Sequence, residues 1–177
     1  MASIILTLVG PDRPGLVSRL SEQVAARGGS WLESRMAHLA GQFAGMVLVS
    51  IGDDQIEALA GAFEALRADG LQVLIHSGAA ETPRTPPPDP LLVLELVCQD
   101  RPGIVRDVTR VLAGSGVNIE ELTTNILSGS FSGETLFHAE ARLRVPAAIG
   151  TDGLRRDLER LGNDLMVDFK LTEPPAG

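Results

Sequence analysis

The sequence predicts an α+β chain of two βαββαβ units in tandem, each with two helices on one face of a four-stranded antiparallel sheet. Three observations lead to this prediction. A proline-rich stretch divides the chain, the segments on its two sides repeat one another, and apolar residues in each repeat change between strand spacing and helical spacing.

The proline-rich stretch is GAAETPRTPPPDP, residues 78–90, in which five of thirteen residues are proline. Three consecutive prolines do not fit inside a helix or a central strand, so we expect a semi-stiff, extended linker. Residues 1–77 then form a first domain and residues 91–177 a second. Each is long enough to bury a small core.

The repeat is clearest when the chain is shifted by 88 positions, which aligns DRPG at 12–15 with DRPG at 100–103. We expect this register to continue without a gap as far as Leu48 and Leu136. The second copy then carries six extra residues before Leu71-Gln-Val-Leu aligns with Leu165-Met-Val-Asp. Such a long match indicates that both halves share one fold.

Each repeat begins with a short apolar strand and continues, after DRPG, with a helix that stops at a glycine, Gly28 or Gly116. Two strands around a glycine-bearing turn follow, then a second amphipathic helix and a last strand. This is the order of the ferredoxin-like fold. The strands are expected at 4–9, 30–39, 43–51 and 71–76, and at 91–98, 117–127, 134–145 and 165–171.

The two DRPG stretches have the chemistry of an anion-binding helix start. We expect the aspartates, Asp12 and Asp100, to be N-caps and the prolines to lie in the first turn. The glycines would let a ligand approach the backbone, and the first amides of each helix lack intrahelical acceptors. These amides suit a carboxylate. A helix start without any ligand remains the alternative.

The stretches LTLVGPDRPGLVSRLSEQVAARGGSW and LELVCQDRPGIVRDVTRVLAGSGVNI resemble the opening of ACT domains, which are small amino-acid-sensing modules. The motifs that support this resemblance are DRPG before a hydrophobic pair and, in the second copy, G-x-N-I about thirteen residues later. Two such units and nothing else resemble the glycine cleavage system transcriptional repressor family. That resemblance implies a protein that senses glycine or a similar small amino acid and restrains a LysR-type activator through protein contact.

The resemblance also implies which residues bind the ligand. Asn118 would contact it from the second strand of its repeat, whereas Ser30, at the matching position of the first repeat, reaches less far. The second site is therefore the more typical one. The residues expected to hold the carboxylate and shape the pocket are Asp12, Arg13, Pro14, Gly15 and Leu16, and Asp100, Arg101, Pro102, Gly103 and Ile104.

Composition argues against several other functions. The formal net charge is −8 and only 3% of the residues are aromatic, so we expect no direct binding of nucleic acid. The N-terminal apolar run is too short for a membrane span or a signal peptide, which favours a cytoplasmic protein without membrane contact. A single cysteine, Cys98, excludes an intrachain disulfide.

No catalytic constellation is visible in the sequence. The histidines His38, His76 and His138 lack metal-ligand spacing, and Cys98 has no evident partner base. We therefore expect neither an enzyme nor a bound metal or cofactor. The segment LSGSFSG, residues 127–133, is expected to form a hairpin tip.

Together these observations predict a non-catalytic, amino-acid-sensing regulator that controls transcription through a protein partner and forms a homodimer. Two other hypotheses stay open. One is a separate regulatory subunit of an amino-acid enzyme. The other is an assembly module whose loops bind no ligand, for which Ser30 in place of asparagine is mild support.

Overall fold

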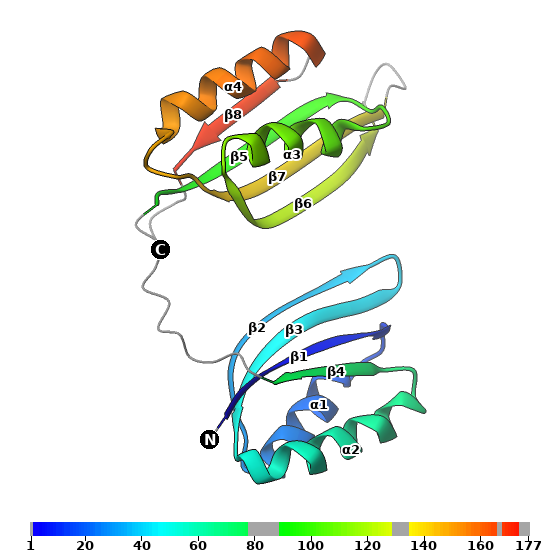
Figure 1. Ribbon diagram of the computed structural model, residues 1–177. Helices are drawn as coiled ribbons and strands as arrows, with labels where there is room; N and C mark the ends of the chain where they lie inside the picture. The colour runs from blue at the N-terminus through cyan, green and yellow to red at the C-terminus, as the bar shows by residue number, and fades with distance from the viewer. Residues whose placement is uncertain (1, 78–88, 129–134, 166–167, 174–177) are drawn as a thin grey trace. The chain divides into compact units, whose positions relative to one another are not determined.

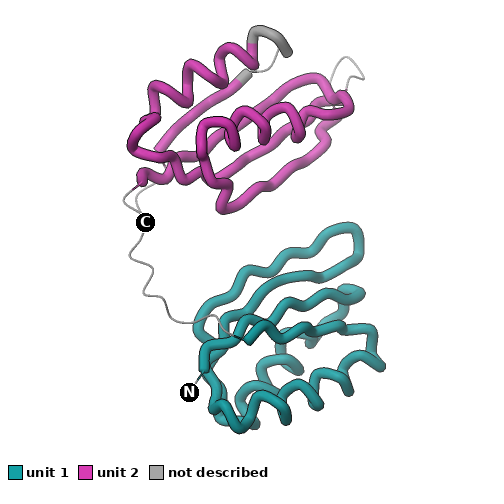
Figure 2. The backbone as a smooth tube through the Cα atoms, in the orientation of Figure 1, with its two compact units in different colours: residues 1–84 teal, residues 85–177 magenta. Residues whose placement is uncertain are grey.

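The computed structural model divides into two compact units, Met1–Arg84 and Thr85–Gly177 (Figure 2). They are called unit 1 and unit 2 below. The structure describes residues 2–77, 89–128, 135–165 and 168–173. The expected linker at 78–90 lies outside the described residues except for its last two positions, and so does most of the expected hairpin tip at 127–133.

Each unit follows the predicted order of strands and helices. Unit 1 contains β1 (Ala2–Pro11), α1 (Leu16–Ala25), β2 (Ser30–Leu39), β3 (Gln42–Ile51), the short 3-10 helix η1 (Asp53–Gln55), α2 (Ile56–Arg67) and β4 (Gln72–Ser77). Unit 2 contains β5 (Leu91–Gln99), α3 (Ile104–Gly114), β6 (Asn118–Ser128), β7 (Thr135–Arg144), α4 (Gly150–Leu165) and β8 (Asp168–Thr172).

Both sheets have the same topology, with strand orders β2-β3-β1-β4 and β6-β7-β5-β8. All neighbouring strands are antiparallel. Two helices cover one face of each sheet, and no described element of the same unit covers the other face (Figure 1). The predicted α+β class with two ferredoxin-like units is confirmed.

The core of each unit lies between the sheet and its helices. Along β1 every second side chain is buried, as strand geometry requires, and these side chains meet the apolar face of α1. Unit 2 repeats this pattern with β5 and α3. The two cores are separate clusters; their most deeply buried side chains include Ile4, Leu6, Leu20 and Leu59 in unit 1, and Leu96, Leu112, Leu143 and Leu154 in unit 2.

The predicted glycine stops of the first helix in each unit are confirmed. Gly28 has a φ of 67°, its N–H donates to Ala25 O, and the next N–H, of Gly29, donates to Val24 O. Gly116 has a φ of 66°, its N–H donates to Ala113 O, and the next N–H, of Val117, donates to Leu112 O. This double pattern is the Schellman motif, in which the left-handed residue is usually glycine.

The repeat register changes at the hairpin, earlier than expected. Gly10 pairs with Phe43, and the equivalent Cys98 pairs with Phe137, so the shift between repeats grows from 88 to 94 positions there. The expected gap-free match as far as Leu48 and Leu136 is therefore wrong. The extra residues lie in the β6–β7 connection, since unit 1 turns tightly through two positive-φ residues, Ala40 and Gly41.

The last strands are also displaced from the expected alignment. Val73 pairs with Leu8, and Phe169 pairs with Leu96, the counterpart of Leu8 in unit 2. The predicted match of Val73 with Val167 is therefore wrong by two positions. The cause is the length of α4, which extends to Leu165, where the sequence pattern predicted the strand to begin.

Candidate functional site

Each DRPG stretch forms the loop between the first strand and the first helix of its unit. Its glycine is the residue immediately before the helix, with a φ of 87° at Gly15 and 91° at Gly103. This left-handed conformation favours glycine strongly, because a Cβ there is strained. The left-handed backbone that the two loops share thus accounts for the glycine in each, whether or not a ligand binds.

The aspartates do not cap the helices. Neither helix start has a side-chain capping hydrogen bond, so the prediction of Asp12 and Asp100 as N-caps is wrong. Asp12 Oδ2 lies 3.7 Å from His38 Nε2 instead. The backbone N–H groups of the two aspartates donate to Gly41 O and Thr135 O, both at 2.9 Å, and so tie each loop to the adjacent hairpin.

The prolines also lie outside the helices, because α1 begins at Leu16 and α3 at Ile104. Their expected position in the first turn is therefore wrong, because Pro14 and Pro102 each lie two residues before the first helical residue. Arg13, Pro14 and Pro102 are exposed, and Arg101 is half-buried. Leu16 and Ile104 are 8% and 2% exposed, so these two predicted site residues belong to the cores.

The backbone amides at both helix starts precede the first helical hydrogen bond. That bond runs from Arg19 N to Gly15 O at 3.0 Å in unit 1, and from Asp107 N to Gly103 O at 2.9 Å in unit 2. The N–H groups of residues 15–18 and 103–106 consequently have no acceptor within their own helix. The positive end of the helix dipole lies at the same place.

The charged side chains at the two helix starts differ. In unit 2 the Asp107 carboxylate accepts hydrogen bonds from Arg106 at 3.0 Å and Arg101 at 3.3 Å. These bonds, that from Arg106 above all, lower the pKa of Asp107 below its usual value. The matching residue of unit 1 is Arg19, which forms an ion pair with Asp69. Unit 2 therefore places a carboxylate where unit 1 places a guanidinium.

The space beside the two glycines differs as well. A Cβ built at Gly15 has no neighbouring atom within 4 Å, whereas a Cβ at Gly103 would lie 2.9 Å from Arg106 Nη2. The Arg106 side chain thus lies over the glycine of unit 2. Arg106 and Asp107 were not among the predicted site residues, although both follow DRPG within one helical turn.

The structure does not bring Asn118 to the DRPG loop of its own unit. Asn118 pairs with Arg144, which also pairs with Leu91 at the start of β5, whereas the loop follows the other end of β5. Ser30 pairs with Ser50, beside Ser3 at the start of β1, and is likewise far from its loop. Neither polar residue therefore lies at the DRPG loop of its own unit.

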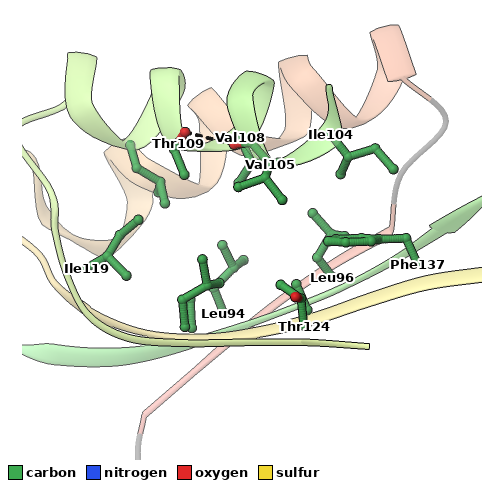
Figure 3. Close-up of a pocket in the computed structure, with 13 residues that line it drawn as sticks. Leu94, Leu96, Ile104, Val105, Val108, Thr109, Ile119, Thr124 and Phe137 are labelled. Atoms are coloured by element: carbon green, nitrogen blue, oxygen red, sulfur yellow. Dashed lines mark hydrogen bonds between the residues drawn. The ribbon is translucent and has the colours of Figure 1, made fainter. Parts of the chain in front are cut away.

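A small apolar pocket adjoins the loop of unit 2. It lies between α3 and the sheet and has a cavity volume of about 30 Å³ (Figure 3). Ile104 and Val105, the two residues after Gly103, line one end, and Ile119 lines another part. The hydroxyls of Thr109 and Thr124 are the polar side-chain groups of the lining, and Thr109 Oγ1 donates to Val105 O within the helix.

The surroundings of two other candidate residues, Cys98 and His138, favour structural roles for them. Cys98 is 6% exposed, and burial raises the pKa of its thiol, which disfavours the reactive thiolate. His138 Nε2 lies 3.4 Å from Glu95 Oε1. Among the described residues, no three His, Cys, Asp or Glu side chains lie close enough to hold a metal ion. None of the helices in the described ranges is long and apolar enough to cross a membrane.

The fold and the paired loops define a tandem ACT protein. Two family models, both described as ACT domain, match residues 2–76 and 92–161, and the chain belongs to this family. Unit 1 and unit 2 are thus two ACT domains in one chain.

Two proteins illustrate what the whole chain is similar to. It is 22% identical over 162 residues to the glycine cleavage system transcriptional repressor of Escherichia coli strain K12, covering 92% of this chain and 85% of the repressor. A crystal structure of an unknown protein from Galdieria sulphuraria has a TM-score of 0.85 and 31% identity, with 98% of each chain covered.

A further crystal structure, which also carries the glycine cleavage system transcriptional repressor name, has a TM-score of 0.71 and 20% identity. It covers 97% of this chain and 96% of its own. At that identity the likeness concerns the fold, and it extends over both ACT units.

Proposed function

We propose that this chain is a non-catalytic regulator that binds a small amino acid at its DRPG loops and acts through a protein partner. The observation that carries the proposal is the duplicated helix start, where the amides of residues 15–18 and 103–106 precede the first helical bond. Such amides, together with the helix dipole, favour a carboxylate. The ACT family and the repressor name of its relative support the regulatory role.

The ligand is proposed to be an amino acid because a zwitterion needs both charges matched. The loop amides suit its carboxylate, and the exposed carboxylates of Asp12 and Asp100 can attract its ammonium group, since the helices do not use them as caps. The proposed site residues remain Asp12 to Leu16 and Asp100 to Ile104. Ser30 and Asn118 join them only if a second ACT unit, such as that of a homodimer partner, supplies them.

Control of transcription is proposed to be indirect, through a protein such as a LysR-type activator. A net charge of −8 repels the phosphates of DNA. The uncovered sheet face of unit 1 carries exposed apolar side chains, since Met46 and Leu74 both flank Thr7 and are 54% and 63% exposed. Exposed apolar groups clustered in this way favour protein contact.

The test is a thermal-shift screen of the full chain with each of the twenty amino acids. Saturating ligand should raise the Tm by a few degrees. The amino acid that does so should then change retention of a purified LysR-type activator on the immobilised chain. If no amino acid shifts the Tm, the sensing role is wrong; if the chain binds DNA directly, the indirect mode is wrong.

A second candidate is an assembly module whose loops bind no ligand. Two observations favour it. Arg106 lies over Gly103 in unit 2, and the polar residues expected to complete each site, Ser30 and Asn118, lie at the far ends of their sheets. The thermal-shift screen separates the two candidates, because a module of this kind responds to none of the amino acids.

A further inference from the structure

The sheet faces that the helices leave uncovered differ in chemistry between the two units. The middle strands show this most clearly, because the ladder registers identify which positions are equivalent. Their central row reads Met46, Thr7 and Leu74 in unit 1 and Glu140, Glu95 and Lys170 in unit 2. The same place in the fold is therefore mainly apolar in one unit and charged in the other.

The uncovered face of unit 1 carries a continuous apolar patch. Its side chains alternate along each strand with those of the buried core. Met46, Leu74 and Val9 are 54%, 63% and 43% exposed. Ile5 and Leu48 are half-buried and pair with each other in the β1–β3 ladder, so they extend the patch across the middle of the sheet. Figure 1 shows this face on the side of the sheet away from α1 and α2.

The charged side chains of the same face neutralise each other. Glu33 and Arg35 lie on the edge strand β2, on the side of the sheet that Met46 shares, and Arg35 Nη1 is 3.0 Å from Glu33 Oε1. Among the described residues of this face, His76 is the remaining titratable side chain. The chain has a net charge of −8, so two copies repel each other in general, but this face adds no net negative charge to the repulsion.

The corresponding face of unit 2 is suited to contact with water. Glu95 Oε1 lies 3.4 Å from His138 Nε2, and Glu95 Oε2 lies 3.9 Å from Lys170 Nζ. Glu140 and Arg142 are exposed on the same side of the sheet. Burying these groups against an apolar surface would remove their hydration without supplying partners, so a face of this kind does not complement the apolar one.

We infer that the uncovered face of unit 1 binds the same face of a second copy of this chain, which gives a closed two-fold dimer. A two-fold interface uses one patch on both partners, so the patch must complement itself, as a neutral apolar face does. Strands about 4.8 Å apart with a rise of about 3.3 Å per residue give this face a footprint of roughly 500 Å². Two such faces together bury roughly 1,000 Å², which is the size that a specific interface needs.

This inference goes beyond the proposed function, because it assigns the apolar face to a second copy and does not depend on amino-acid binding. The test is analytical ultracentrifugation of the full chain, which should sediment as a dimer. The decisive variants are Met46→Glu and Leu74→Lys. Both introduce the residue that unit 2 carries at the equivalent place, at exposed positions, so both should fold.

Each substitution occurs twice in a two-fold interface, so the dissociation constant of the dimer should rise at least about 100-fold in either variant. The two variants change the net charge in opposite directions, so repulsion between the chains as a whole cannot explain a loss in both. The matched control is Ala65→Glu. Ala65 is an exposed residue of α2, on the other side of the sheet, and its substitution should leave the dissociation constant unchanged.

A monomeric wild-type chain overturns the inference, and so does a dimer that persists in both Met46→Glu and Leu74→Lys. Dissociation of Ala65→Glu as well would assign the effect to added charge and contradict the placement. If the wild-type chain is monomeric, retains a LysR-type activator and loses it in Met46→Glu, the face binds the regulator; the inference is then wrong and the proposed function stands. A dimer that dissociates in both face variants, in a chain whose Tm no amino acid shifts, supports the inference and overturns the sensing role.

Discussion

Thr124 of unit 2 lies opposite Ala139 in the β6–β7 ladder, at the position where Met36 of unit 1 lies opposite Gly45. The same backbone thus holds a long flexible side chain in one repeat and a short β-branched one in the other. Because the two units share one topology, side chains at equivalent ladder positions can be compared directly.

The apolar pocket of unit 2 should accept a larger side chain at Ala141, one of its lining residues in the sheet. Ala141→Val inserts the residue that unit 1 has at this place and should raise the free energy of unfolding of unit 2 by about 1 kcal/mol. Calorimetry should detect a rise in Tm of roughly 4–8 °C for a domain of this size. The reverse exchange in unit 1, Val47→Ala, creates a cavity and should cost about 2 kcal/mol. A lower Tm for Ala141→Val would mean that the cavity lacks room for two methyl groups.

The loop glycines should be required by the backbone. Gly15→Ala places a Cβ on a residue with a φ of 87° and should destabilise unit 1 by about 1–2 kcal/mol in urea unfolding, although no atom lies within 4 Å of the new methyl group. Larger side chains at Gly103 carry the same strain and also meet Arg106, so they cannot separate a blocked ligand from a damaged fold.

The control for this substitution is Gly61→Ala. Gly61 lies inside α2 and also has open space at the Cβ position, but helical backbone suits alanine. This variant should gain up to about 1 kcal/mol. If both glycine variants changed stability in the same direction, the left-handed conformation would not be the cause.

Acid should weaken unit 2 through the contact between Ser115 and Asp157. Ser115 Oγ donates a 2.9 Å hydrogen bond to the Asp157 carboxylate, and this bond, together with Arg160, lowers the pKa of Asp157. A carboxyl group whose pKa is lower in the folded state stabilises the fold above its unfolded pKa of about 3.9, and this stability disappears as the pH falls through the folded pKa.

The measurement is urea unfolding of Ser115→Ala at pH 7 and near pH 2. The variant should lose more stability at pH 7 than at the acid pH, because the protonated Asp157 gains less from the hydroxyl. Ser21→Ala serves as the control: Ser21 Oγ donates to the backbone oxygen of Ser18, which does not titrate, so its effect should not depend on pH. Equal losses at both pH values in Ser115→Ala would contradict the assignment.

Cys98 should be unreactive in the folded protein. Its side chain is 6% exposed, pairs across the ladder with Phe137, and has a thiol pKa raised by burial. A thiol reagent at pH 8 should therefore label it slowly in buffer and fully in denaturant. Fast labelling of the folded chain would show that the C-terminal end of β5 opens, or that the thiol is activated.

The strands and helices could be predicted well because apolar spacing and glycine stops are local signals. Trp31 and Ile119 could also be matched from the sequence, since they lie before the hairpin where the shift of 88 still holds. The pocket could not be predicted in full. Its lining residue Ala141 lies beyond the longer hairpin of unit 2, and only the ladder register reveals that it is equivalent to Val47.

The helix starts were harder to predict than the helices. Asp12 and Asp100 have the residue type of an N-cap, but the left-handed glycine three positions later moves the helix start forward, and the aspartate amides bond to the hairpin instead. Asn118 shares a strand with pocket residues, yet strand direction places it at the end away from the loop. Proximity of this kind depends on topology, which residue type alone does not encode.

The two left-handed glycines have a consequence for tracing how such chains diverge after duplication. Selection for a foldable polypeptide is enough to retain glycine at this turn, so this glycine would persist in a copy that had long ceased to recognise a metabolite. Counting this glycine among homologues would then overestimate how many copies are sensors.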